Sequence, residues 1–151
     1  MMLIMCHCGE HRFAVDSRHV SEVLPRVRMH ALGGAPSWFA GVLIHRGSAT
    51  PVIDLSQLAE GKDCPASLSS RIAIVQTELR GSRRRFGVLA ERVGLREVRG
   101  GADQSFARAD GPALFGELRL DEQGVFQLLD IARLVSEERQ AVLFPAEGSH
   151  D

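Results

Sequence analysis

The sequence is short of features that define several large classes of protein. Of its 151 residues only 3 are cysteines, and the formal net charge is −1. An odd and small number of cysteines does not make a disulfide framework, so reduced thiols and a cytoplasmic location are expected. A net charge near zero provides no long-range attraction for nucleic acid or for an anionic membrane surface, so neither is an expected partner.

A long hydrophobic run is also missing. The apolar start from Met1 to Met5 has no basic residue before it. It is too short for the apolar region of a signal peptide or for a membrane span. We therefore expect no direct insertion into a membrane, and we interpret this segment as part of the first strand.

Motifs of the common enzyme classes are absent as well. The sequence contains no Gly-x-Ser-x-Gly, phosphate-binding loop, dinucleotide fingerprint or His-Glu-x-x-His pattern. Its 6 histidines are scattered without the spacing of metal ligands. No cofactor and no metal are therefore expected.

The three cysteines are candidates for metal binding or thiol catalysis. On a strand, Cys6 and Cys8 share one face while His7 points to the other, so the three cannot hold one ion without a distorted backbone. Buried thiols are the interpretation that we favour for this pair. Cys64 lies beside Pro65 in a polar loop, where we expect an exposed thiol of ordinary reactivity. A thiol- or metal-dependent enzyme using Cys6, Cys8 and Cys64 stays as an alternative of another class.

Short apolar runs separated by turn residues make up most of the chain. About ten such runs, spaced roughly every 8–12 residues, predict an all-β domain. Two small barrels that share a core are the economical arrangement, because one open sheet of that size tends to curl or split. We expect a single domain over residues 1–141 with the break between barrels near 61–68, and a flexible tail over 142–151.

Local signals add detail to this pattern. Asp54 and Asp130 are expected to cap two short helices, because an aspartate side chain accepts hydrogen bonds from the first free N–H groups. Pro36 favours a third short helix at its first turn. Residues 100–112 are expected to be irregular, and 121–124 to form a four-residue hairpin loop.

The most informative stretch runs from Gly41 to Leu55. Two short apolar runs flank Arg46 and Gly47, which predicts a β-hairpin whose tight reversal uses a positive φ at Gly47. Arg46 then lies at the turn, where its planar guanidinium is either solvated or grips a carboxylate on a partner. His45 beside it is either an exposed residue at the end of a strand or part of that contact.

This stretch resembles the CheW family, the adaptors of bacterial chemosensory arrays. The family pattern Gly-Val/Leu-x-x-x-Arg-Gly-x-x-x-Pro-Val-x-Asp-Leu is present from Gly41 to Leu55, and residues 20–24 resemble the Glu-Val segment that precedes it. The resemblance covers nearly the whole chain, from Leu3 to Glu137. It implies two five-stranded SH3-like barrels around a common core, with short helices, and a protein that is not an enzyme.

The resemblance also implies partners. It implies a scaffold that couples the cytoplasmic tip of a chemoreceptor to the regulatory domain of a CheA-type histidine kinase, with strand edges and the groove between the barrels as binding surfaces. The predicted partner-binding residues are Val20, Glu22, Gly41, His45, Arg46 and Gly47. For three of these positions another interpretation stays open: core packing for Val20, a solvated carboxylate for Glu22 and backbone geometry for Gly41.

One departure from the family pattern concerns the choice of partner. Many members have Asn-Leu before Arg-Gly, whereas this chain has Ile44 and His45. A ring residue in that place, together with residues 23–27, resembles the adaptors of Wsp-type surface-sensing pathways, whose output is cyclic diguanylate. A Wsp-type adaptor is therefore the alternative within the family, and a small-molecule sensor using the groove between the barrels is a third possibility.

Overall fold

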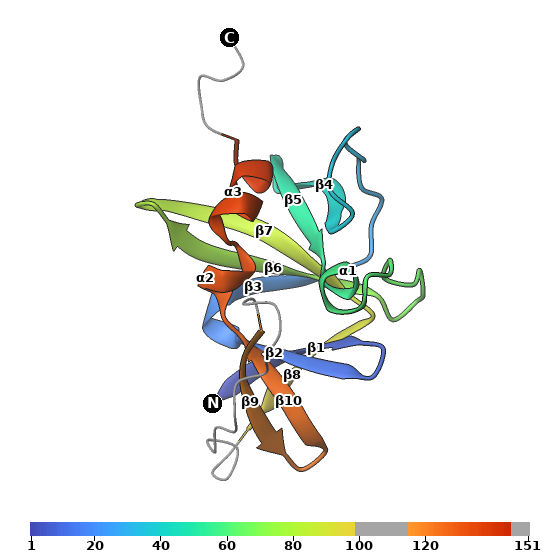
Figure 1. Ribbon diagram of the computed structural model, residues 1–151, viewed down its shortest axis with the longest axis vertical. Helices are drawn as coiled ribbons and strands as arrows, with labels where there is room; N and C mark the ends of the chain where they lie inside the picture. The colour runs from blue at the N-terminus through green and yellow to red at the C-terminus, as the bar shows by residue number, and fades with distance from the viewer. Residues whose placement is uncertain (99–114, 146–151) are drawn as a thin grey trace.

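Two β-sheets make up the body of the molecule (Figure 1). The computed structural model describes residues 1–98 and 115–145. The expected all-β class, with two five-stranded barrels and short helices, is confirmed. In the described residues the strands are β1 Met2–Cys8, β2 His11–Asp16, β3 Val20–Pro25, β4 Phe39–His45, β5 Ser48–Asp54, β6 Arg71–Leu79, β7 Ser82–Ala90, β8 Arg92–Glu97, β9 Phe115–Asp121 and β10 Gly124–Leu129, and the helices are the 3-10 turn η1 Ser17–His19, α1 Leu55–Glu60, α2 Ile131–Leu134 and α3 Glu137–Leu143.

The two sheets have the same kind of topology. Sheet A has the strand order β8-β1-β2-β10-β9, and sheet B has the order β3-β6-β7-β5-β4. Each joins antiparallel hairpins through one parallel pair, β10 with β2 in sheet A and β5 with β7 in sheet B. β3, which ends at Pro25, lies at the edge of sheet B, where proline does not have to donate a hydrogen bond to a second neighbour.

The expected break near 61–68 is wrong. That loop joins α1 to β6, so it lies between two strands of sheet B, β5 and β6. The chain instead passes between the sheets at η1 and again between β7 and β8. Polar composition marks residues 61–68 as a loop, but it does not say which sheet the flanking strands join. The loop is held to sheet B because Asp54 Oδ2 accepts a hydrogen bond from the backbone N–H of Cys64 at 2.9 Å.

Alternation along the strands divides the buried side chains among three clusters. In β1, Leu3 and Met5 belong to a cluster made from sheet A, whereas Ile4, Cys6 and Cys8 belong to a larger cluster. The larger cluster includes side chains from both sheets, and a third is made from sheet B and the loop that contains Cys64. The expected shared core is therefore present, with Cys6 and Cys8 on the same face as predicted.

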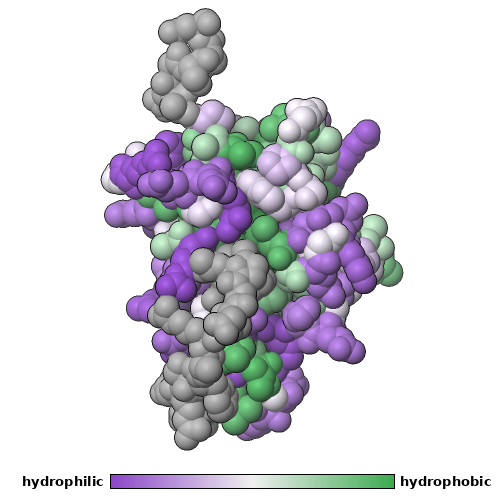
Figure 2. Space-filling view, viewed as in Figure 1, coloured by the Kyte–Doolittle hydropathy of each residue, from purple (hydrophilic) through white to green (hydrophobic). Residues whose placement is uncertain are grey.

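The surface contrasts with these cores. In Figure 2, hydrophilic side chains cover large parts of the visible face, and smaller apolar areas lie between them. Within residues 1–98 and 115–145, no helix has the length and apolar character that a membrane span requires.

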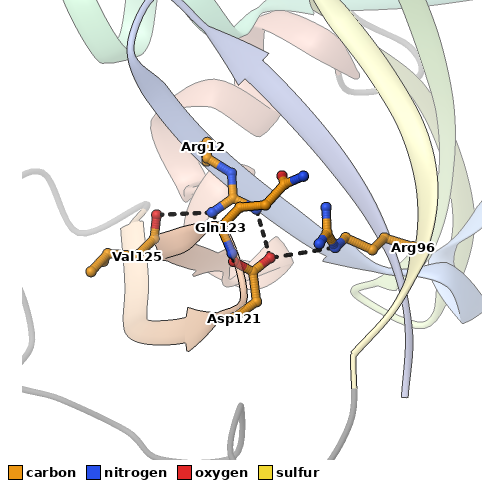
Figure 3. A network of polar contacts seen from close by, with 5 residues as sticks. All are labelled: Arg12, Arg96, Asp121, Gln123 and Val125. Carbon is orange, nitrogen blue, oxygen red and sulfur yellow. Dashed lines mark hydrogen bonds and ion pairs between the residues drawn. The ribbon is translucent and has the colours of Figure 1, made fainter.

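An ion-pair network joins the two outer strands of sheet A (Figure 3). Asp121, at the end of β9, accepts two hydrogen bonds from the guanidinium of Arg12 on β2, at 2.6 and 3.0 Å. Arg96 on β8 lies 3.5 Å from the same carboxylate. The network thus closes sheet A with side chains where its outer strands share no backbone ladder.

The end of the described chain is longer and more ordered than expected. Ser136 caps α3 by accepting a hydrogen bond from the N–H of Arg139, and Leu143 at its last turn is buried in the shared core. The expected start of a flexible tail at residue 142 is therefore wrong. Residues 146–151 of that tail, and the segment 100–112, lie outside the described residues.

Two local expectations also need correction. The stretch after Pro36 forms a turn, closed by a hydrogen bond from the Phe39 N–H to the Pro36 carbonyl, instead of a helix. The hairpin loop expected over 121–124 has only residues 122 and 123 between its strands, because both strands extend further toward the turn. The helix caps at Asp54 and Asp130 are confirmed.

Candidate partner-binding surface

The predicted hairpin is present, and its turn is tight. β4 and β5 pair in antiparallel register down to His45 opposite Ser48, so only Arg46 and Gly47 lie between the strands. Arg46 has φ 51 and Gly47 has φ 77. Positive φ at both central residues is the geometry of a type I′ turn, which matches the twist of the strands. It is costly for a non-glycine residue such as Arg46, by about 1–2 kcal/mol.

Four polar side chains meet beside this turn. His45 Nε2 lies 2.6 Å from Glu22 Oε2, and Arg46 Nη2 lies 3.5 Å from the same oxygen. On its other side the imidazole accepts a hydrogen bond at Nδ1 from Arg85 Nη1, at 3.2 Å. These residues, Glu22, His45, Arg46 and Arg85, form what we name the seam cluster.

The seam cluster lies where the outer strands of sheet B meet. Glu22 belongs to β3 and His45 to β4, which are at opposite ends of the strand order. The hydrogen bond from His45, together with the charge of Arg46, lowers the pKa of the Glu22 carboxyl. The seam therefore presents an ionised carboxylate beside a permanent cation at neutral pH.

Exposure separates the members of this cluster. The Arg46 side chain is 73% exposed and that of Glu22 is 34% exposed, whereas the imidazole of His45 is 8% exposed. Ile44, the residue before His45, is among the exposed large apolar side chains. The interpretation of His45 as an exposed residue is thus wrong, because strand alternation turns Ile44 outward and His45 inward.

The remaining predicted residues have mainly structural positions. Val20 is partly buried and packs against the shared core. Gly41 has φ 144, and a Cβ there would lie 2.9 Å from the carbonyl oxygen of His30. Gly47 has open space around it and is required by the turn. The structure thus brings Glu22, His45 and Arg46 together and leaves Val20 and Gly41 apart from that cluster.

Arg85 is the member that sequence reasoning missed. It belongs to the run Arg83 to Arg85, in which no motif distinguishes one arginine from the next. It reaches the hairpin because β7 pairs in parallel with β5, a pairing that residue types do not reveal. Only the sheet order places it beside His45.

A second surface lies where the two sheets meet. A cavity of about 400 Å³ is bordered by sheet A, sheet B and the segment that contains α2. Its lining combines polar side chains such as His19 and Thr77 with apolar ones such as Ile131. This is the position expected for a groove between the barrels.

The cysteines lie away from both surfaces, inside the cores. Burial raises the pKa of Cys6 and of Cys8 to about 12, and it also raises the pKa of Cys64. The expected exposure of Cys64 is wrong, because its loop is drawn onto sheet B and leaves the residue 3% exposed. Among residues 1–98 and 115–145, no group of three or more histidine, cysteine and acidic side chains is arranged to hold a metal ion.

The thiols are expected to resist Ellman's reagent in the native protein and to react once the protein is unfolded in urea. With pKa values of about 12 for Cys6 and Cys8, roughly one thiol in ten thousand is a thiolate at about pH 8. Absorbance at the thionitrobenzoate band measures the reaction. Rapid labelling of a native cysteine would instead favour the thiol-dependent alternative.

Comparisons with known proteins bear on the whole chain. The chain is similar to a solved structure titled as the crystal structure of the scaffolding protein TtCheW from Thermoanaerobacter tengcongensis, with a TM-score of 0.74 and 19% identity, covering 89% of this chain and 87% of that one. At that identity the likeness shows the fold. A comparison with curated proteins gave no match. A family model described as CheW-like domain matches residues 2–139, and since this span takes in both sheets and the hairpin, the chain belongs to the CheW family.

Proposed function

We propose that this protein is a cytoplasmic, non-enzymatic adaptor that couples the cytoplasmic tip of a chemoreceptor-type protein to the regulatory domain of a CheA-type histidine kinase. Membership of the CheW family supports a scaffold role in chemosensory signalling. Whether the output is motility or, as in the Wsp-type alternative, cyclic diguanylate synthesis stays a prediction.

The observation that carries the proposal is the state of Arg46. Its guanidinium is 73% exposed, and its ion pair with Glu22 is 3.5 Å long. A guanidinium has five donors in a planar fork, so most of its hydrogen-bonding capacity remains available to a carboxylate or carbonyl on a partner. A strained turn that holds such a group outward is typical of a binding site.

An adaptor also needs a second surface for its other partner. The cavity between the sheets is separate from the seam cluster, and its mixed lining suits a helix with one apolar face. We assign the receptor tip, a helical coiled coil, to this groove, and the kinase domain to the seam.

The variant Arg46→Asp is expected to weaken binding of the kinase regulatory domain by at least about tenfold, because a second carboxylate beside Glu22 replaces attraction by repulsion. Isothermal titration calorimetry with the purified cognate domain measures the affinity. Urea unfolding of the same variant should show a cooperative transition, since Arg46 is exposed.

The matched control is Arg92→Asp. Arg92 is an exposed arginine on β8 of sheet A, so its reversal makes the same change of net charge at a distant place. The control should bind as the wild type does. An equal loss of affinity in both variants would show that the effect of Arg46→Asp depends on net charge alone. A folded wild-type protein that binds neither kinase nor receptor would refute the proposed function.

A further inference from the structure

The contacts of His45 determine the position of its proton. A guanidinium only donates hydrogen bonds, so Nδ1 of His45, which faces Arg85 Nη1 at 3.2 Å, must carry a lone pair. The remaining proton of a neutral imidazole is then on Nε2, from which it is donated to Glu22 Oε2 at 2.6 Å. Arg85 thereby selects the tautomer that can hold Glu22.

The imidazole is also fixed in place. It is 8% exposed and lies at the end of β4, next to the turn that brings Arg46 round. Both His45 and Arg46 approach the same oxygen, Oε2, and in the described part of the chain Oε1 of Glu22 accepts no hydrogen bond. One carboxylate oxygen is thus anchored from inside while the other is left for a ligand.

We propose that His45 is a positioning residue for the partner-binding pair Glu22 and Arg46, and that it acts only as the neutral Nε2–H tautomer that Arg85 selects. This inference rests on the proposed function for its partner, a protein that offers a donor to Glu22 and a carboxylate to Arg46. The inference adds His45 as a residue that does not contact the partner but fixes the geometry of Glu22 and Arg46, which do.

The neighbours of His45 hold the imidazole from both sides. The groups that face the imidazole are Glu22 from β3, Arg46 from the turn and Arg85 from β7, while β5 contributes the neutral Ser48 opposite in register. An Nδ1–H ring could not accept the hydrogen bond from Arg85, so only the Nε2–H tautomer satisfies both neighbours. Loss of either contact would free the ring to turn, and Glu22 would lose its anchor.

The decisive variant is His45→Gln. A glutamine amide offers one donor and one acceptor in the arrangement of the neutral imidazole. His45→Leu keeps an apolar side chain in the buried site and removes both hydrogen bonds. We expect His45→Leu to weaken binding of the kinase regulatory domain by about tenfold or more, and His45→Gln to keep it within about threefold.

Rescue by the conservative variant is the readout that a merely structural role would not give. His45→Gln should restore the affinity that His45→Leu loses, because the amide keeps both hydrogen bonds of the imidazole. His11→Gln, at an exposed histidine on β2, is the matched control and should bind as the wild type does. Nitrogen-15 shifts of the His45 ring should identify the Nε2–H tautomer in the free protein.

The outcomes separate the inference from the proposed function. A wild-type protein that binds no kinase domain refutes the proposed function and this inference with it. Wild-type binding together with a loss of more than about threefold in His45→Gln, or an Nδ1–H ring in the free protein, overturns the inference alone. Neither of these two measurements depends on His45→Leu being folded.

Discussion

The variant Arg12→Met is expected to lose about 3 kcal/mol of its free energy of unfolding. Asp121 is 4% exposed, and its carboxylate depends on the bidentate contact from Arg12 at 2.6 and 3.0 Å (Figure 3). Removing the guanidinium leaves a buried charge whose remaining cation, Arg96, lies 3.5 Å away and is more exposed. Urea unfolding followed by circular dichroism measures the loss.

The matched control for this prediction is Arg18→Met. Arg18 makes a similar bidentate contact with Asp16, but its side chain is 84% exposed. Solvent screens such a pair, so the control should unfold at the wild-type urea midpoint. If Arg12→Met unfolds at the midpoint of the control, the network in sheet A contributes no more than a surface ion pair.

The same pair predicts how stability depends on pH. Burial alone would raise the pKa of Asp121, but hydrogen bonds from Arg12 and Gln123 and the charges of Arg12 and Arg96 outweigh it and lower the pKa from 3.8. A lowered pKa in the folded state contributes stability above the unfolded value, which is lost as the pH falls through the folded value. The loss on acidification below about pH 4 should be smaller in Arg12→Met.

The outer strands of both sheets are joined by a buried or partly buried carboxylate, but the two carboxylates have different roles. In both, a carboxylate near an outer strand meets a side chain from the opposite outer strand: Asp121 meets Arg96, and Glu22 meets His45. Asp121 is enclosed by its cations, so it stabilises the fold. Glu22 is partly exposed beside the outward-facing Arg46, so its seam is also a surface that a partner can reach.

Local structure was predictable where one residue type has one physical role. The hairpin follows from the requirement for positive φ at Gly47, and the two helix caps follow from aspartate acceptors at Asp54 and Asp130. The order of strands was not predictable in the same way. Alternation states which face of a strand is buried, but not which strand lies beside it. The parallel pair of β5 and β7 and the two true points of crossing between the sheets were therefore missed.

The candidate site was predictable to a similar extent. Arg46 and Glu22 follow from the hairpin and from the resemblance to the CheW family, and the structure brings them to within 3.5 Å. The burial of His45 and the contribution of Arg85 depend on the closing of sheet B, which brings residues 40 positions apart into contact. No periodicity or motif in the sequence encodes such a contact.

The variant Gly41→Ala is expected to lose about 3 kcal/mol of its free energy of unfolding. Gly41 has φ 144, which is strained for any residue with a Cβ, and that Cβ would lie 2.9 Å from both the His30 carbonyl oxygen and the Met29 Cβ. His30 is held there by two backbone hydrogen bonds with Val42, at 2.8 and 2.9 Å. The segment therefore cannot move away without breaking them.

Gly47→Ala is the matched control, because Gly47 also has a positive φ but has nothing within 4 Å of its Cβ position. It should lose only about 1 kcal/mol, the cost of the backbone conformation alone. Urea midpoints of the two variants, measured together, separate close packing from conformational strain. A Gly41→Ala variant that is stable but fails to bind the kinase domain would make Gly41 a contact residue. The expected loss of stability would instead show that Gly41 lets the Met29–His30 segment pack over β4. That packing holds in place the strand that carries His45 and leads to Arg46.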